Sequence, residues 1–269
     1  MDATGTAMVT GASRGLGRAI AIDLARAGFD VVATMRDPGA GKGLAAEIED
    51  AAGTITVERL DVKDLASFQM PEGLRVLVNN SGIDGDYLPL EHTPIDQWRE
   101  VFETNVFGLV EVTRRAIPAL RATGGGVVCS ITSSSITVPV PFFSVYRASK
   151  AAVSALDDTL RVELAPFGIR VVEIMPGPIQ TDMLFASERI AEAVAYDDYR
   201  AMAEAAYEMR MRTTDQYTPA ATAAAAIRAA ILDDRGPMRY GCDPMSVAMI
   251  DMWRRSSDEE LFRSVTALA

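Results

Sequence analysis

Residues 7–28 read AMVTGASRGLGRAIAIDLARAG, and this stretch decides the fold. A short apolar run, Ala7 to Val9, stops at Thr10-Gly11, and a helical pattern then runs from the glycines to Gly28. A strand, a glycine-rich turn and an amphipathic helix in this order are typical of the first unit of an open α/β sheet. The stretch therefore predicts a parallel sheet that carries helices on its faces.

The same alternation continues along the rest of the chain. Short strands rich in Val and Ile, with helices between them, form parallel sheets that are covered on both faces. We therefore predict one doubly wound, Rossmann-type α/β domain over residues 1–269, because no internal repeat or low-complexity linker divides it. The segment between Asp61 and Asn79 is too short for a full crossover helix and a strand, which predicts a loop or a single turn. Further strands are expected at 31–35, 55–60, 76–78, 127–131 and 170–175, and helices at 44–52, 95–120 and 146–164.

Residues 182–217 depart from this rhythm. They are helical in pattern, rich in Met and Tyr, and follow the end of a strand. Insertions at the carboxyl ends of strands border the ligand site in open α/β sheets. The segment is interpreted either as a surface helix pair that packs its Met side chains on the core or as a mobile lid over a ligand, and the two are compatible.

Composition excludes several classes of function. The formal net charge of −11 argues against a nucleic-acid partner and against an anionic membrane surface. No apolar run approaches the ~18–20 residues that cross a bilayer, and the N-terminus lacks a secretion signal. Cys129 and Cys242 provide no disulfide framework, and no Cys/His cluster has zinc spacing. We therefore expect a cytoplasmic protein without a metal site, and we expect the one histidine, His92, at the surface.

The glycine-rich turn, TGASRGLG at 10–17, is suited to a pyrophosphate. Glycine lets the backbone turn sharply and lets a phosphate approach the peptide N–H groups at the positive end of a helix. A glycine-rich turn alone is weak evidence. Its position between the first strand and the first helix makes it a dinucleotide-binding candidate.

The tip of the second strand indicates which dinucleotide is bound. A protein that binds unphosphorylated ribose places a carboxylate there. This chain has Arg36 at that point, with no acid until Asp37, and Arg14 lies inside the glycine turn. Two guanidinium groups suit a 2′-phosphate, because each offers paired donors. We therefore favour NADP(H) over NAD(H), and the alternative is that both arginines are simply solvated.

Tyr146 and Lys150 are four residues apart in YRASK, so on a helix they share one face. The chain has only three lysines, which makes a chance pairing of this kind improbable. An ammonium beside a phenol favours the phenolate, so we expect Lys150 to lower the pKa of Tyr146 toward working pH. Tyr146 is therefore a candidate general acid/base.

These motifs resemble, in order and spacing, those of the short-chain dehydrogenases/reductases. The resemblance covers about residues 5–241 and rests on TGASRGLG (10–17), Asp61-Val62, NNSG (79–82), ETNVFG (103–108), Ser133, YRASK (146–150) and PGPIQT (176–181). It implies a Rossmann-type fold and hydride exchange between a nicotinamide and a carbonyl or alcohol carbon. Ser81 stands where the family usually has alanine, a small change that we expect to be tolerated.

The resemblance also implies a role for each matching residue. Tyr146 would be the acid/base, Lys150 would hold the ribose and tune the tyrosine, Ser133 would hydrogen-bond the substrate oxygen, and Asn105 would anchor a proton-relay water. Family members are commonly homodimers or homotetramers built on helices that correspond to 95–120 and 146–164. Together with the residue arguments above, the expected cofactor-binding set is Gly11, Ser13, Arg14, Gly15, Leu16, Gly17, Arg36, Asp61, Val62, Asn80, Tyr146, Lys150, Pro176, Gly177, Ile179 and Thr181.

The leading hypothesis is an NADP(H)-dependent oxidoreductase that acts on a small carbonyl or alcohol substrate. ATMRDP (33–38) and NVFG (105–108) are similar to family members that act on lipophilic alcohols, which favours an apolar pocket. The alternatives are a catalytically silent nucleotide-sensing protein of the same fold and an NAD-preferring alcohol dehydrogenase. A sugar-nucleotide epimerase or dehydratase is disfavoured by chain length. Each of seven apolar or aromatic residues is interpreted either as part of the pocket wall or as an ordinary core residue: Val138, Val140, Phe142, Phe143, Leu184, Tyr196 and Tyr199.

Overall fold

The computed structural model describes residues 1–186 and 189–266. Its main sheet has the strand order β3-β2-β1-β4-β5-β6-β9, and every neighbouring pair is parallel. The chain builds outward to β3, returns to the other side of β1 and then builds in the opposite direction, which is the doubly wound order. The Rossmann-type prediction is therefore confirmed. The strands are β1 Thr6–Thr10, β2 Asp30–Met35, β3 Thr54–Arg59, β4 Leu74–Asn79, β5 Gly126–Ile131, β6 Ile169–Ile174 and β9 Arg239–Tyr240.

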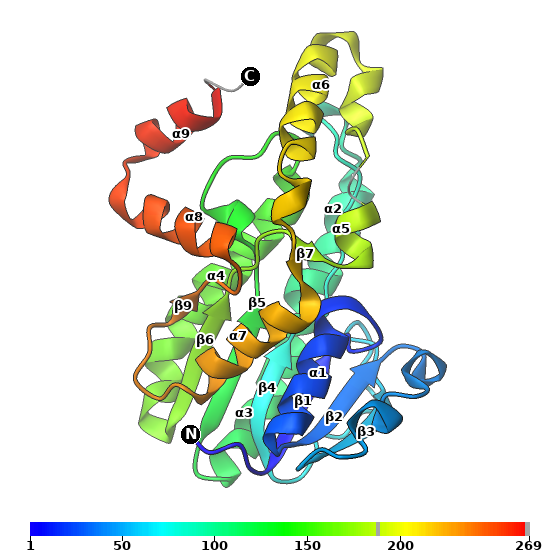
Figure 1. Ribbon diagram of the computed structural model, residues 1–269, viewed down its shortest axis with the longest axis vertical. Helices are drawn as coiled ribbons and strands as arrows, with labels where there is room; N and C mark the ends of the chain where they lie inside the picture. The colour runs from blue at the N-terminus through cyan, green and yellow to red at the C-terminus, as the bar shows by residue number, and fades with distance from the viewer. Residues whose placement is uncertain (187–188, 267–269) are drawn as a thin grey trace.

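Helices cover both faces of this sheet (Figure 1). On one face, α1 (Gly15–Ala27) and α7 (Ala220–Leu232) bury Ile20, Leu24 and Ile227 against the strands. On the other, α3 (Leu109–Ala122) and α4 (Ser144–Leu164) bury a second apolar cluster. Successive side chains of a strand point to opposite faces, so β4 contributes Leu77 to one cluster and Val78 to the other.

Two predicted helices differ from the structure. The helix predicted at 95–120 is divided into α2 (Ile95–Phe102), a π-helical turn (Glu103–Gly108) and α3. The helix predicted at 44–52 is wrong, because only a 3₁₀ turn forms at Ala45–Ile48. Gly43 has a φ of 88° just before that turn, a conformation outside the right-handed helical region. The crossover between β3 and β4 contains turns and no helix in its described residues, as predicted.

The segment predicted as helical at 182–217 contains α5 (Asp182–Ala186), a 3₁₀ turn (Glu192–Ala195) and α6 (Asp197–Met211). Ser187 and Glu188 lie outside the described residues. At the base of the segment, β7 (Ile179–Gln180) pairs with β8 (Thr218–Pro219). The two ends of the insertion therefore lie side by side and are joined by this strand pair.

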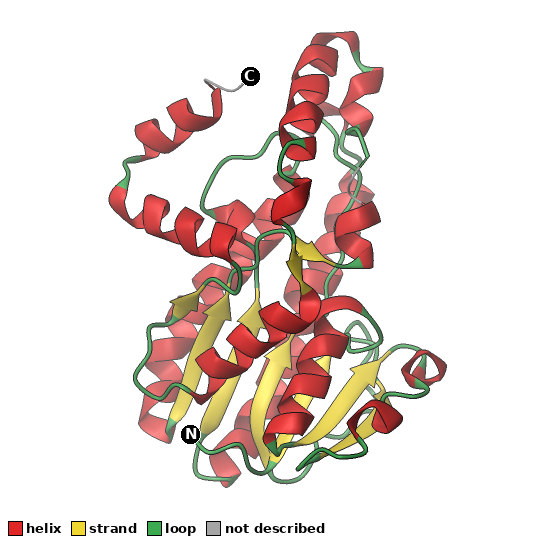
Figure 2. Cartoon of the chain, in the orientation of Figure 1, coloured by secondary structure: helices red, strands yellow, loops and turns green. Residues whose placement is uncertain are grey.

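The C-terminal part forms α8 (Pro244–Arg255) and α9 (Asp258–Thr266). Figure 2 shows these helices and the 182–217 segment standing beyond the carboxyl ends of the strands, on either side of the same region. In the described part of the chain, no helix combines the length and the apolar character that a membrane crossing requires.

Candidate functional site

A cavity of about 1090 Å³ lies at the carboxyl ends of the strands. It extends from the glycine-rich turn to the 182–217 segment, and α8 and α9 also line it. Every predicted site residue except Asn105 contributes to its wall. Residues scattered from 11 to 181 are therefore brought to one surface, as expected for an open α/β sheet.

The glycine-rich turn is shaped for close approach. Gly11 has a φ of 67°, and a Cβ there would lie 2.9 Å from Ser81 Oγ. A Cβ at Gly17 would lie 2.5 Å from the Gly11 carbonyl oxygen and would also clash with the Asn80 amide. Asn80 Nδ2 in turn donates to the carbonyl oxygens of Thr10 at 2.9 Å and Gly11 at 3.2 Å, which fixes the turn.

The first turn of α1 faces this cradle. Among the described residues, no side chain caps the N-terminus of this helix at Arg14. Its N–H groups are therefore available to an anion, and the helix dipole favours negative charge at that end. The cradle and the uncapped helix together fit the pyrophosphate of a dinucleotide.

At the far end of the cavity, Arg36 follows β2 and is exposed on the cavity wall. The neighbouring residue Asp37 does not line the cavity, and its carboxylate accepts a hydrogen bond from Gly39 N at 2.8 Å and caps its own turn. Arg14 lies 3.7 Å from Asp182 and is 77% exposed. Asp61 Oδ1 accepts from Lys63 N at 3.0 Å. This end of the cavity therefore offers two guanidinium groups, and the acid nearest the strand tip, Asp37, does not line it.

Ser133, Tyr146 and Lys150 come together in the middle of the cavity. Ser133 lies two residues beyond the end of β5, where it caps a 3₁₀ turn (Ser134–Ile136), and its Oγ accepts from Ser135 N at 3.2 Å. Tyr146 and Lys150 occupy successive turns at the start of α4. Ser133 hydrogen-bonds the tyrosine hydroxyl. The strand end and the helix start thus place three polar groups at one point.

The predicted effect of Lys150 on the tyrosine is wrong for this structure. Burial raises the pKa of Tyr146 to about 12, and this outweighs the hydrogen bond from Ser133, which lowers it. The Lys150 ammonium donates to Ile131 O at 2.8 Å and lies 5.8 Å from the centre of the tyrosine ring. Burial also lowers the pKa of Lys150 to about 8. The ammonium is therefore held at a backbone carbonyl, and the phenol is kept in its neutral form.

Asn105 lies just behind the cavity wall, in the π-helical turn. Its amide exchanges two hydrogen bonds with the backbone of Ile83, both 2.8 Å long, and donates to Ser149 Oγ at 3.0 Å. A Cβ on Gly82 would touch both Asn105 Oδ1 and Lys150 Nζ at 3.3 Å. The π-turn therefore places this amide beside Lys150, one layer away from the cavity.

Aromatic rings lie next to Tyr146 in the cavity wall. Phe143 stacks on Tyr87 at 4.5 Å between ring centres and meets Tyr146 edge-on at 6.3 Å. Phe142 has a φ of 66°, an unfavourable conformation for a residue with a side chain. The Arg189 guanidinium lies 4.9 Å above the Tyr87 ring. The loop before α4 is thus fixed by ring contacts against the residues around 87 and 189.

Five of the seven candidate pocket residues line the cavity: Val138, Val140, Phe142, Phe143 and Leu184. The predictions for Tyr196 and Tyr199 are wrong. Tyr196 stacks on His92 at 3.7 Å, and Tyr199 meets Phe142 edge-on at 6.2 Å and donates to Glu91 at 2.8 Å. These two rings therefore attach the insertion to the 84–92 loop. Lining residues that sequence reasoning missed include Tyr87, Met202, Tyr207, Met245, Met249 and Phe262.

Asp243 is a further residue that sequence reasoning missed. It caps α8 through a reciprocal pair of hydrogen bonds with Ser246, and its Oδ2 accepts from Gly177 N at 2.7 Å. It therefore ties the Pro176–Pro178 turn to the C-terminal helices. Asp followed by Pro at the start of a helical pattern is a recognised N-cap signal, so the sequence did contain evidence for the cap.

The doubly wound sheet and the glycine-rich cradle at the carboxyl ends of its strands are features of the Rossmann-type dinucleotide-binding proteins. A model of the short chain dehydrogenase family matches residues 5–191, and the chain belongs to that family.

Three comparisons with individual proteins agree with this assignment. The chain is 36% identical over 202 residues to uncharacterized oxidoreductase YusZ of Bacillus subtilis, and the match covers 71% of each chain. It is 34% identical over 188 residues to the NADPH-dependent 3-dehydrocapnine reductase of Ornithobacterium rhinotracheale, with 66% of each covered. A solved short-chain dehydrogenase from Streptomyces avermitilis superposes with a TM-score of 0.75 at 31% identity, over 98% of this chain and 97% of that one.

Proposed function

We propose that this protein is an NADP(H)-dependent oxidoreductase that interconverts a carbonyl and a secondary alcohol on a lipophilic small molecule. The observation that carries the proposal is the meeting of Ser133, Tyr146 and Lys150 in one cavity, between a phosphate-sized cradle and an apolar wall. Family membership supports the oxidoreductase class.

The side chains suit the reductive direction. Ser133 and Tyr146 would both hydrogen-bond the substrate oxygen, and Tyr146 would donate the proton that this oxygen takes up. With a pKa of about 12 the phenol is protonated at neutral pH, as a proton donor must be. When bound, the nicotinamide supplies the hydride. Lys150 would hold the ribose hydroxyls beside Tyr146, and Asn105 would anchor a proton-relay water.

The preference for NADP(H) rests on the far end of the cavity. Arg36 and Arg14 would share the 2′-phosphate, while the Asp37 carboxylate caps its own turn and does not line the cavity. The relative from Ornithobacterium rhinotracheale, which is named as NADPH-dependent, supports the same choice. The remaining predicted residues, among them Asp61, Val62, Ile179 and Thr181, would line the adenine and nicotinamide ends.

The substrate class follows from the wall around Tyr146. Val138, Val140, Phe143, Met202 and Met249 surround the space that a substrate would occupy. Pockets of this kind bind ligands mainly by apolar burial, with a few polar groups that orient the reacting atoms. We propose that the 182–217 insertion acts as a lid over this space.

The decisive experiment is a turnover screen with the purified protein. NADPH and NADH are tested with a panel of lipophilic ketones, aldehydes and secondary alcohols, and Arg36→Ala is compared with wild type. We expect NADPH to be preferred and Arg36→Ala to weaken NADPH by about 10-fold or more while NADH changes little. Arg121→Ala, which removes an arginine packed on Phe167, is the matched control.

Two results would contradict the proposal. Equal weakening of NADPH and NADH by Arg36→Ala would refute the 2′-phosphate argument. Cofactor binding without turnover on any member of the panel would favour the nucleotide-sensing alternative.

We also propose a homodimer or homotetramer built on the α2–α3 and α4 helices. Phe107, which is 58% exposed, and Val162, which is 75% exposed, are large apolar side chains on these surfaces. Light scattering on Phe107→Asp and Val162→Asp variants tests this, and an unchanged mass for both would refute it.

A further inference from the structure

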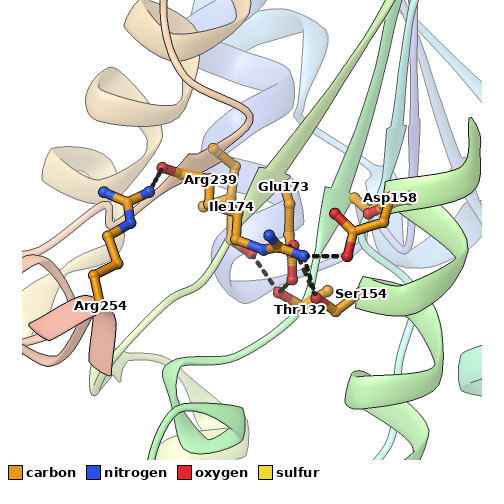
Figure 3. Close-up of polar contacts among 9 residues, drawn as sticks. Thr132, Ser154, Asp158, Glu173, Ile174, Arg239 and Arg254 are labelled. Atoms are coloured by element: carbon orange, nitrogen blue, oxygen red, sulfur yellow. Dashed lines mark hydrogen bonds and ion pairs between the residues drawn. The ribbon is translucent and has the colours of Figure 1, made fainter. Parts of the chain in front are cut away.

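A fully buried carboxylate on β6 gathers donors from three other elements. Glu173 has no exposed surface. Its Oε1 accepts from Thr132 Oγ1 at 2.8 Å, and its Oε2 accepts from Ser154 Oγ at 3.0 Å and from Arg239 Nε at 2.8 Å (Figure 3). A buried carboxylate is costly unless its charge is balanced and its oxygens are hydrogen-bonded, and here both conditions are met.

The partners of this carboxylate adjoin the candidate catalytic groups. Thr132 immediately precedes Ser133, and its backbone N–H also donates to Ile174 O at 2.8 Å. Ser154 follows Lys150 by one turn of α4, just as Lys150 follows Tyr146, so the three share one face of the helix. Glu173 therefore binds the strand end that carries the serine and the helix that carries the tyrosine and lysine.

Arg239 supplies the opposite charge from the far edge of the sheet. Its strand pairs with β6, with Arg239 directly opposite Glu173. The guanidinium also donates to Asp158 Oδ2 at 2.8 Å and Ser154 Oγ at 3.2 Å, and it lies 5.7 Å from the centre of the Trp253 ring. In Figure 3 it reaches between Glu173 and Asp158. Arg239 lies outside the family match, which ends at residue 191.

We propose that Glu173 is a positioning residue for the active site, with Arg239 as its counter-ion. The inference rests on the proposed oxidoreductase function. Glu173 does not reach the cavity and acts through Thr132 and Ser154, by setting where Ser133 stands relative to Tyr146 and Lys150. A displacement of these groups by a fraction of an ångström slows the chemical step and leaves cofactor binding intact, because the glycine cradle lies elsewhere.

The test is Glu173→Gln in the full-length protein. Glutamine has nearly the same shape but no charge, so Arg239 loses its buried counter-charge, and in either orientation of the amide an NH2 group replaces one of the two acceptor oxygens. We expect kcat to fall about 10-fold or more while the KM for NADPH stays within about twofold. Hydrogen exchange at the amides of Thr132 and Ser134, and in the first turns of α4, should become faster.

A matched control separates positioning from general destabilisation. Asp23→Asn breaks the Arg228–Asp23 ion pair, which is 2.7 Å long, partly buried, and joins α1 to α7 away from Tyr146. At a comparable loss of Tm, this variant should keep kcat within about twofold of wild type. An equal loss of kcat in both variants, or an unchanged kcat in a folded Glu173→Gln protein, would overturn the proposal.

Two further measurements keep the outcome unambiguous. If Glu173→Gln fails to fold, Thr132→Val removes a single donor to the carboxylate, and we expect it to lower kcat about threefold to tenfold; no change would refute the inference.

If the wild type turns over no substrate, the proposed function fails, and hydrogen exchange then tests the positioning by itself. Unchanged exchange at residues 132–134 in Glu173→Gln would refute the positioning even in that case.

Discussion

Lys150→Met should make the protein more stable at neutral pH while abolishing turnover. Lys150 is only 5% exposed, and burial lowers its pKa from the ordinary 10.5 to about 8. Because of this pKa difference, keeping Lys150 charged in the folded protein lowers the free energy of unfolding by about 3 kcal/mol at pH 7.5. Methionine has a similar volume and no charge to bury.

Part of that gain is offset by a lost hydrogen bond. Lys150 Nζ donates to Ile131 O at 2.8 Å, and removing the donor leaves a buried carbonyl oxygen without that partner. A loss of this kind costs about 1–2 kcal/mol. The net stabilisation expected at pH 7.5 is therefore about 1–2 kcal/mol.

The pH dependence gives the sharper signature. Between about pH 8 and 10.5 the unfolded chain still holds the Lys150 proton while the folded protein has released it, so the unfolded state binds more protons. The destabilising effect of Lys150 therefore becomes smaller as the pH rises across that window, and the wild-type protein becomes more stable. The advantage of Lys150→Met should be constant below about pH 8, shrink by about 2 kcal/mol by pH 10, and then approach zero or reverse.

Urea unfolding followed by tryptophan fluorescence, at pH 7.5, 9 and 10, measures this difference. Lys63→Met is the control, because Lys63 is partly exposed and its loss should change stability by no more than about 0.5 kcal/mol. A Lys150→Met protein that is less stable at pH 7.5, or an advantage that does not change up to pH 10, would refute the reasoning. Either result would mean that the desolvation cost of the buried Lys150 ammonium is already offset in the folded protein.

Three other substitutions probe the site. Tyr146→Phe should lower kcat about 100-fold or more and leave the Kd for NADPH within about twofold in a fluorescence titration, and substantial residual turnover would exclude the tyrosine as the proton donor. Gly17→Ala should abolish cofactor binding in the same titration, because its Cβ would clash with Asn80; normal binding would show that the cradle is not the pyrophosphate site. Asp243→Asn should lower the unfolding free energy by about 1–2 kcal/mol in urea and raise the KM for NADPH, because Gly177 loses a charged acceptor; a change in stability alone would limit Asp243 to its capping role.

The sequence predicted the sheet and most of the site because their signals are local. The glycine turn at 10–17 and the pair of Tyr146 and Lys150 can each be recognised from residues that are only a few positions apart in the sequence. Parallel topology then brings the ends of distant strands to one edge. Local motifs at the strand ends, combined with the parallel topology, therefore explain why almost every predicted residue lies on the cavity wall.

Effects that depend on distant residues were not predictable in the same way. The raised pKa of Tyr146 depends on burial and on where Lys150 points, and spacing along a helix reveals neither. The π-turn Glu103–Gly108 replaces a regular helix, and the glycine at its end does not by itself predict a π-turn. Glu173 and Arg239 are 66 residues apart, and their pairing required the position of the last strand.

Tyr196 and Tyr199 show the same limit. The neighbours that these two rings meet are on the loop around Glu91 and His92, far away in sequence. An aromatic residue in an insertion can equally well line a pocket or anchor the insertion beside it. The structure assigns these two rings to anchoring.

The pairing of Ile179–Gln180 with Thr218–Pro219 has a consequence for how this protein can change over evolution. Because the two ends of the insertion are fixed to each other, its length and composition can vary without moving the turn at Pro176 or the helix that begins at Ala220. The segment behaves as an exchangeable cassette. Replacing the insertion with that of a relative, joined at the same strand pair, is a direct route to new substrate ranges with unchanged catalytic residues.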